Sequence, residues 1–196
     1  MALMLYVILP KSLIIGPRYL IPALELALLI PITIFNPCRE VHETKALRYV
    51  AILLIALVNL ANLASVALLI DHLVNSANVN AKSLVFAALA VWLTNVIVFG
   101  LWYWELDRGG PHKRNTHHER HPDFLFPQMT MRDISPQNWM PIFLDYLYLA
   151  LTNATAFSPT DTMPLSPTAK SLMSIESIIS MLTVIVVAAR AVNILP

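Results

Sequence analysis

The feature that most constrains this chain is a set of long apolar stretches that recur along it. A helix needs about 20 apolar residues to cross the roughly 30 Å hydrocarbon core of a bilayer. Four stretches reach that length: residues 18–35, 47–71, 82–104 and 167–194. Only 13% of the residues are charged, whereas soluble domains carry about 25%. The sequence therefore predicts an all-α membrane protein with four transmembrane helices.

The first 104 residues divide into a short lead-in and a membrane region. Residues 1–17 are apolar but lack a basic start and a small-residue cleavage site, so we expect an interfacial lead-in rather than a cleaved signal peptide. Residues 18–104 then form a three-helix membrane region.

A net charge of +1 predicts no nucleic-acid partner. Because Cys38 is the one cysteine, it cannot form an intrachain disulfide.

A short apolar segment precedes the last long one. Residues 141–155 begin with proline and are predicted to form a helix, which at 1.5 Å per residue is about 22 Å long and too short to cross. Proline-rich residues 156–164 follow, and then the long segment 167–194. Irregular backbone at membrane depth is tolerated where protein buries it or water bathes it. This order predicts one short re-entrant helix in addition to the four spanning helices.

The end of the short helix and the turn after it carry a motif. The chain reads Thr155-Ala156-Phe157-Ser158-Pro159-Thr160-Asp161-Thr162-Met163-Pro164. This resembles the filter of the potassium-channel superfamily, T-T-V-G-Y-G-D-x-x-P, with matches at Thr155, Asp161 and Pro164. The resemblance implies a pore-like module over 141–196, made of a pore helix at 141–155, a filter-like loop at 156–164 and an inner helix at 167–194.

Three stretches, the last of which contains this motif, are similar to a group of bacterial integral membrane proteins. They are WYWELDRGGP (102–111), PDFLFPQM (122–129) and NATAFSPTDTMPL (153–165). This resemblance implies a multi-pass protein of the bacterial inner membrane. Lysine and arginine counts favour a cytoplasmic loop at 105–140, whereas potassium-channel topology implies the opposite, so both orientations stay open.

The filter-like loop departs from the family pattern at its centre. Ser158 and Thr160 stand where the family has glycine, and Pro159 stands where it has tyrosine. The family's filter aims successive backbone carbonyls at the ion. That backbone is one that glycine permits, whereas proline fixes φ and removes a donor. We therefore expect a weakly selective cation pathway without a K⁺-type carbonyl ladder.

The predicted ion pathway has side-chain ligands in place of carbonyls. Its residues are Thr155, Ala156, Phe157, Ser158, Pro159, Thr160 and Asp161. Four Asp161 carboxylates around an axis would form an acidic ring, and the pore helix would add the negative end of its dipole. One loop cannot enclose an axis, so a homotetramer in the lipid bilayer is expected. The permeant ion would be a monovalent cation, and no bound cofactor is expected. The alternative to an acidic ring is a structural role, in which Asp161 caps the turn or pairs with Lys170.

Two acids lie within predicted spans, Glu25 in the first and Glu176 in the last. Intramembrane acids face a cavity or a partner, so each has an ion-path role or a buried, hydrogen-bonded role. A row of hydroxyls runs along the last span at every third residue, and it favours helix packing over pore lining. Its members are Ser171, Ser174, Ser177, Ser180 and Thr183.

Histidines gather in the polar loop at 105–140. His117, His118 and His121 are candidate metal ligands, but their spacing matches no closed zinc site. The alternatives are a solvated loop and a pH sensor. No nucleophile–base pair, glycine-rich phosphate loop or zincin motif occurs, so no enzyme is predicted. Two rivals to the channel remain: a non-conducting membrane scaffold or accessory subunit that keeps the pore fold, and a metal- or pH-sensing membrane protein.

Overall fold

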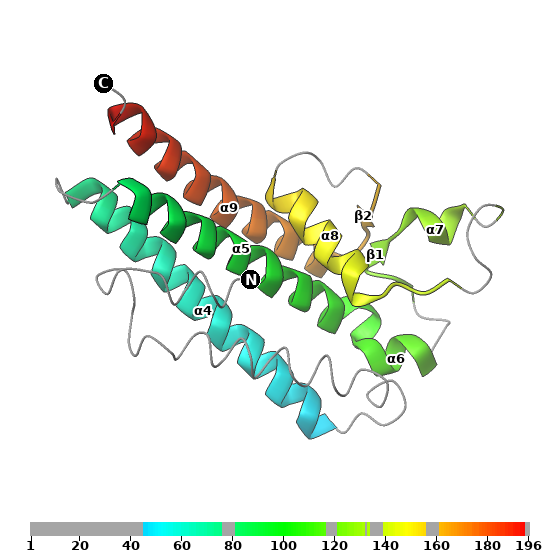
Figure 1. Ribbon diagram of the computed structural model, residues 1–196. Coiled ribbons are helices and arrows are strands. Elements are labelled where there is room, and N and C mark those ends of the chain that lie inside the picture. Colours follow the sequence, from blue (N-terminus) through cyan, green and yellow to red (C-terminus); the bar gives the residue numbers. More distant parts are fainter. Residues whose placement is uncertain are drawn as a thin grey trace.

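Helix α5 lies at the centre, and the other helices pack around it (Figure 1). The computed structural model describes residues 45–75, 81–116, 121–131, 133, 139–155 and 161–194. The elements are α4 (Lys45–Asn75), α5 (Ala81–Leu106), η2 (Asp107–Gly109), α6 (Pro111–Thr116), β1 (Phe124–Leu125), α7 (Pro127–Thr130), α8 (Phe143–Ala154), β2 (Met163–Pro164) and α9 (Pro167–Ile194). In the most apolar part of α5, 61% of the residues are buried, against 33% in α4 and 28% in α9. The core therefore follows α5.

Three of these helices are long and apolar enough to cross a membrane. Their candidate spans are Arg48–Asp71, Val85–Gly109 and Pro167–Ala188. The helices predicted at 47–71, 82–104 and 167–194 are confirmed, and the described part is mostly helical. The predicted helix at 18–35 and the lead-in at 1–17 lie outside the described residues, so a fourth span stays a prediction.

Helix α8 buries one face and exposes the other. Its buried residues are Tyr146, Leu149, Ala150, Asn153 and Ala154, and this spacing of three and four residues is that of one helical face. Leu144, Tyr148 and Leu151 are exposed on the opposite face. The helix predicted at 141–155 is thus confirmed, but it begins two residues later, at Phe143.

The start of α8 is set by Asp145. Its carboxylate Oδ2 accepts a hydrogen bond of 2.7 Å from the backbone N–H of Ile142, just before the helix. A side chain that satisfies a free N–H at a helix start stabilises the helix by about 1 kcal/mol.

We expect Asp145→Ala to lower the free energy of unfolding by about 1 kcal/mol, as measured by denaturation of the purified protein in detergent. Asp145→Asn keeps the acceptor and should lose less, and equal stability of wild type and Asp145→Ala would contradict the assignment.

Helices α5 and α8 lie close together at Gly100. A Cβ at this position would lie 3.2 Å from Leu147 Cα and 3.4 Å from Leu147 Cδ1. Small residues let membrane helices pack with their backbones close together. Gly100 therefore sets how near α8 lies to the central helix.

Two short strands join segments that are far apart in sequence. β1 and β2 pair antiparallel, with Phe124 opposite Pro164 and Leu125 opposite Met163. The backbone N–H of Leu165 also bonds to the carbonyl of Asp123 at 2.8 Å. Helix α9 begins two residues later, where Pro167 occupies its first turn and Ser166 Oγ accepts from the N–H of Ala169 at 3.1 Å. These bonds hold the start of α9 against the segment that follows α5.

The segment at 105–140, expected as a polar loop, contains several short elements. They are η2, α6, β1 and α7. It also buries charge, because Glu105 is 2% exposed, Asp107 0% and Arg114 3%. Within it, Asp107 pairs with Arg114, and both also bond to the surrounding backbone.

Candidate functional site

A buried group of three residues joins the last turn of α8 to α9. We call this group the intramembrane cluster, and it consists of Tyr103, Asn153 and Glu176. Asn153 Nδ2 donates to Glu176 Oε2 at 2.6 Å and to the carbonyl of Met173 at 2.9 Å. The hydroxyl of Tyr103, on α5, donates to the same Oε2. Three helices thus meet at one carboxyl oxygen.

Glu176 has no exposed surface. Both donors reach Oε2, and within the described residues no group bonds to Oε1. Asn95, also on α5, donates from Nδ2 to the backbone carbonyl of Glu176 at 3.3 Å. This is the buried, hydrogen-bonded arrangement that was one of the two expectations for Glu176. Asn95 also joins two helices, as expected for an amide within a membrane bundle.

Hydroxyls extend the contact between α8 and α9. Ser177 Oγ donates to Asn153 Oδ1 at 3.2 Å, and Ser180 Oγ donates to the carbonyl of Ala154 at 2.5 Å. Trp92 Nε1, on α5, donates to Ser180 Oγ at 2.6 Å. The last carbonyls of a helix lack partners within it, and Ser180 supplies one here. The packing interpretation is confirmed for these two serines.

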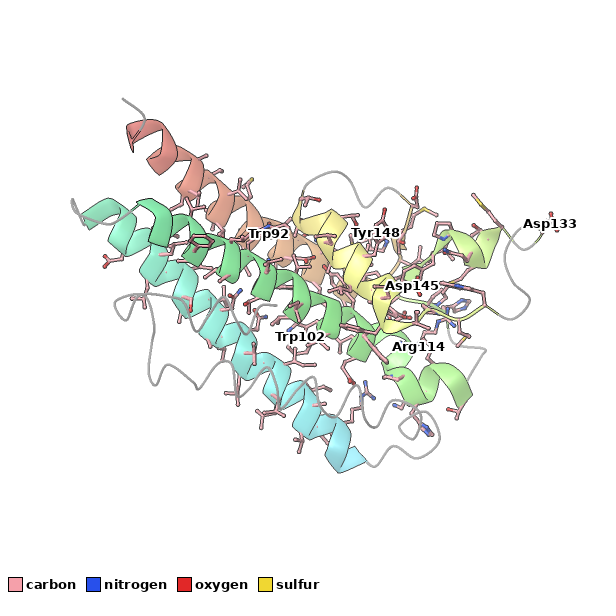
Figure 2. All side chains as sticks on the ribbon, in the orientation of Figure 1. Trp92, Trp102, Arg114, Asp133, Asp145 and Tyr148 are labelled. Atoms are coloured by element: carbon pink, nitrogen blue, oxygen red, sulfur yellow. The ribbon has the colours of Figure 1, made fainter. Side chains whose placement is uncertain are left out.

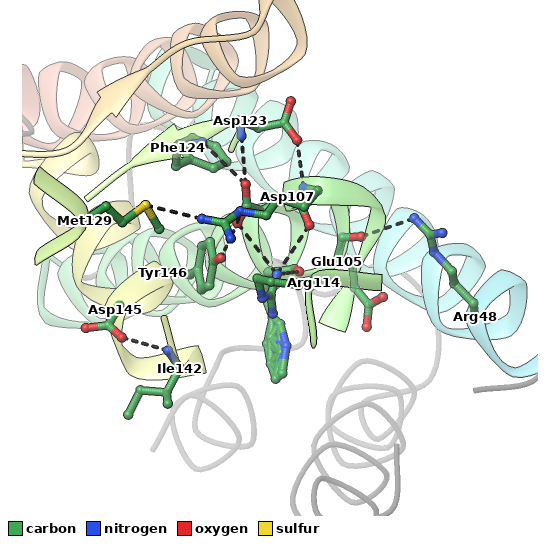
Figure 3. A network of polar contacts seen from close by, with 12 residues as sticks. Arg48, Glu105, Asp107, Arg114, Asp123, Phe124, Met129, Ile142, Asp145 and Tyr146 are labelled. Carbon is green, nitrogen blue, oxygen red and sulfur yellow. Dashed lines mark hydrogen bonds and ion pairs between the residues drawn. The ribbon is translucent and has the colours of Figure 1, made fainter. Parts of the chain in front are cut away.

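A second buried group, the loop cluster, lies where α5 ends (Figure 3). It consists of Asp107, Arg114, Asp123 and Tyr146. Asp107 Oδ1 accepts from the backbone N–H of Asp123 at 2.9 Å, and Oδ2 accepts from the hydroxyl of Tyr146 at 2.5 Å. Burial raises the pKa of the Tyr146 phenol above its ordinary range, so this hydroxyl is a neutral donor at physiological pH. Asp107 therefore ties α5 to the β1 region and to the first turn of α8.

Arg114 neutralises this carboxylate and packs on two aromatic rings. Its Nη1 lies 3.8 Å from Asp107 Oδ2 and donates to the carbonyl of Trp104 at 3.1 Å. Its guanidinium carbon is 5.1 Å from the centre of the Tyr146 ring and 5.3 Å from that of Trp104. A desolvated cation over aromatic faces is stabilised by the ring quadrupoles. The loop cluster is thus a neutralised, structural site.

The backbone turn that presents Asp107 needs unusual conformations. Arg108 has a φ of 53°, followed by Gly109 at 83° and Gly110 at 104°. Positive φ is rare for a side chain other than glycine, and the Arg108 N–H bonds to Asp123 Oδ2 at 2.9 Å. The sequence LDRGG could have signalled this site, since an acid beside a base and two glycines at the end of a span indicates a built turn. The sequence interpretation missed it.

The predicted pathway residues fall only partly within the described chain. Thr155 donates from Oγ1 to the carbonyl of Leu151 at 3.0 Å, and Asp161 is exposed. Residues 156–160 lie outside the described residues, and so does Glu25. The structure does not place Asp161 with Glu176, which is buried against α5 and α8.

The predicted metal ligands also fall largely outside. His117 and His118 are not among the described residues, and His121 is exposed. Within the described part of the chain, no three His, Cys, Asp or Glu side chains gather as a metal site would require. The histidine assignments therefore stay predictions.

Together, the fold and the site define a helical protein with three candidate membrane spans and a short helix fastened among them by polar groups. Comparison of the chain with models of protein families, with curated proteins and with solved structures gives no match. The contacts described above are therefore what any functional proposal rests on.

Proposed function

We propose that residues 141–196 form a re-entrant pore module, and that four copies of the chain surround a weakly selective pathway for monovalent cations. In this proposal the chain has four spanning helices, the first at 18–35, and α8 is the pore helix. Asp161 supplies an acidic ring, and Ser158 and Thr160 supply further oxygen ligands.

The depth reached by the end of α8 carries the proposal. Ala154 bonds to Ser180, which lies about 20 Å along α9 from Pro167 at 1.5 Å per residue. Yet Leu165 is bonded to Asp123, which belongs to the loop cluster, and the same cluster holds the first turn of α8. The chain therefore enters along α8 and has returned to the same end by residue 165. This path supports a re-entrant segment.

Electrostatics at the end of α8 favour a cation. A helix carries about half a negative charge at its C-terminus, and α8 ends at Ala154, just before the filter-like loop. Asp161 is an exposed carboxylate a few residues further on. Both charges have the sign that attracts cations.

The outer faces of α8 and α9 support assembly. Tyr148 lies on the outer face of α8 and is 60% exposed (Figure 2). On α9, the exposed apolar residues are Ile175, Ile178, Met181, Leu182, Val184 and Ile185. In the proposed tetramer part of these two faces meets neighbouring copies and the rest meets lipid.

The rival function is a non-conducting membrane scaffold or accessory subunit. The intramembrane cluster favours it, because the side-chain amide of Asn153 donates to Glu176 and to the Met173 carbonyl and accepts from Ser177. Polar groups consumed in this way hold helices together and leave fewer ligands for an ion. The same experiment separates the two functions.

The test is oligomeric mass followed by cation flux. Native mass spectrometry in nanodiscs should give a tetramer, and liposomes containing the protein should pass Na⁺ and K⁺. Asp161→Asn should change the conductance or the Na⁺/K⁺ ratio several-fold, since it removes the acidic ring. Asp133→Asn is the matched control, because it makes the same charge change on an exposed turn far from Trp92 and the helix bundle (Figure 2).

The opposing results are equally clear. A stable monomer or dimer leaves no closed ring of pore loops and ends the channel proposal. A tetramer without flux favours the scaffold. Flux that Asp161→Asn leaves unchanged would show that the acidic ring is wrongly assigned.

A further inference from the structure

The hydrogen bonds around Glu176 are unevenly divided between its two carboxyl oxygens. Oε2 accepts from both Tyr103 and Asn153, and no described residue bonds to Oε1. A neutral carboxylic acid has one oxygen that accepts and a hydroxyl that donates. Because Oε2 already accepts two hydrogen bonds, Oε1 is the oxygen left to carry the proton of a neutral acid.

The neighbouring long helices offer no cation to balance a charge. Between Arg48 and Asp71, α4 contains no charged residue, and between Lys82 and Glu105 the same holds for α5. In that part of α5, Tyr103 is the titratable group, and it is already a donor to Glu176. A fully buried carboxylate without a cation is costly, so the neutral acid suits this site.

The remaining charged and titratable groups of α8 and α9 have other partners, are exposed or lie far along the helix. On α8, Asp145 bonds to its own helix start, Tyr146 bonds to Asp107 and Tyr148 is exposed. On α9, Lys170 is exposed, and Arg190 lies about four turns beyond Glu176. Strand β2, which touches α9, is Met-Pro and has no titratable group.

We propose that Glu176 is a proton-binding site that couples pH to the end of α8. With the proton on Oε1, the intramembrane cluster is neutral and Asn153 is fastened to α9. Loss of that proton to water strengthens the two hydrogen bonds to Oε2 but leaves a buried carboxylate without a cation. In this proposal the second effect is larger, so that water enters between α8 and α9 and lowers the cost of the charge. The contact is therefore closed at low pH and loosens as the pH rises through the titration of Glu176.

The position of Asn153 gives the proton site its consequence. Asn153 lies in the last turn of α8, and Thr155 directly follows that helix and opens the filter-like motif. Loosening Asn153 frees the residues that lead into that loop. The effect on ion passage rests on the proposed function, whereas the proton site and the loosening of α8 do not.

Infrared spectroscopy of the full chain in nanodiscs tests the proton site directly. We expect a C=O stretching band of a buried carboxylic acid that disappears as the pH is raised. Glu176→Gln should lack this band, and Asp161→Asn should keep it. A wild-type spectrum that Glu176→Gln reproduces at every pH would overturn the proposal.

A second variant keeps the test valid if Glu176→Gln does not fold. Tyr103→Phe retains the acid and removes one of its two donors. The pH at which the band disappears should therefore move in Tyr103→Phe. An unmoved band would show that Glu176 is not the group that titrates.

Amide hydrogen exchange tests the coupling to α8. Above the titration, protection at residues 150–155 should fall roughly tenfold relative to Glu176→Gln at the same pH, the ratio for about one buried hydrogen bond. Exchange that runs parallel in the two proteins at all pH values would refute the coupling. Neither measurement uses ion flux, so an inactive channel with a titrating Glu176 would end the proposed function and leave the proton site standing.

Discussion

Replacing Asp107 with leucine is expected to lower the free energy of unfolding by about 3–5 kcal/mol, the cost of breaking a buried ion pair from one side. The change leaves Arg114, only 3% exposed, without its carboxylate. It also removes the acceptor for the Tyr146 hydroxyl and for the N–H of Asp123. Chemical denaturation of the purified protein in detergent, followed by circular dichroism, measures the loss.

A double variant shows whether the charge causes that loss. Asp107→Leu combined with Arg114→Met removes both charges, so it should be more stable than Asp107→Leu alone. Asp133→Asn, on an exposed turn, should stay within about 0.5 kcal/mol of wild type. If the double variant is less stable than the single one, the buried pair does not account for the effect.

Replacing Gly100 with leucine is expected to cost about 3 kcal/mol, the upper end for overpacking a core. The new side chain would enter the space where the Leu147 backbone lies 3.2 Å from the position of a Cβ. Helix α8 cannot yield freely, because Tyr146 and Asn153 hold it at both ends. Thermal unfolding in detergent measures the destabilisation.

The matched change is Gly100→Ala. Its one added carbon needs a shift of a few tenths of an ångström at Leu147, and alanine regains up to about 1 kcal/mol of helix propensity over glycine. The two effects nearly cancel, so stability close to wild type is expected. Equal stability of Gly100→Leu and Gly100→Ala would show that α5 and α8 are not packed as closely as described.

The long helices could be predicted from the sequence because the membrane imposes a local rule. Twenty apolar residues suffice to indicate a span, and α4, α5 and α9 lie close to their expected bounds. The exact start of α8 was harder to predict from the sequence. Proline at 141 suggested the first turn, but the carboxylate of Asp145 fixes the helix start beside Ile142.

The polar clusters could not be predicted, because their partners are far apart in sequence. Tyr103 and Glu176 are separated by 73 residues, and Asp107 and Tyr146 by 39. Apolar residues are spread around α9 between the hydroxyls, so its pattern did not indicate which helix Glu176 would meet. Hydrophobic periodicity places a residue on a face only when the opposite face is polar.

Glu176 follows Asn153 by 23 residues, and this separation also has a consequence for biosynthesis. During translation, α8 is complete before α9 has left the ribosome, and chains fold from the N-terminal end as they emerge. Until Glu176 has been synthesised, the amide of Asn153 has no carboxyl partner, and α8 cannot pack against α9. The newly made chain therefore passes through a stage in which α8 lacks its hydrogen bonds to α9. In the re-entrant arrangement proposed above, α8 would gain its contacts with α9 only after α9 has been made.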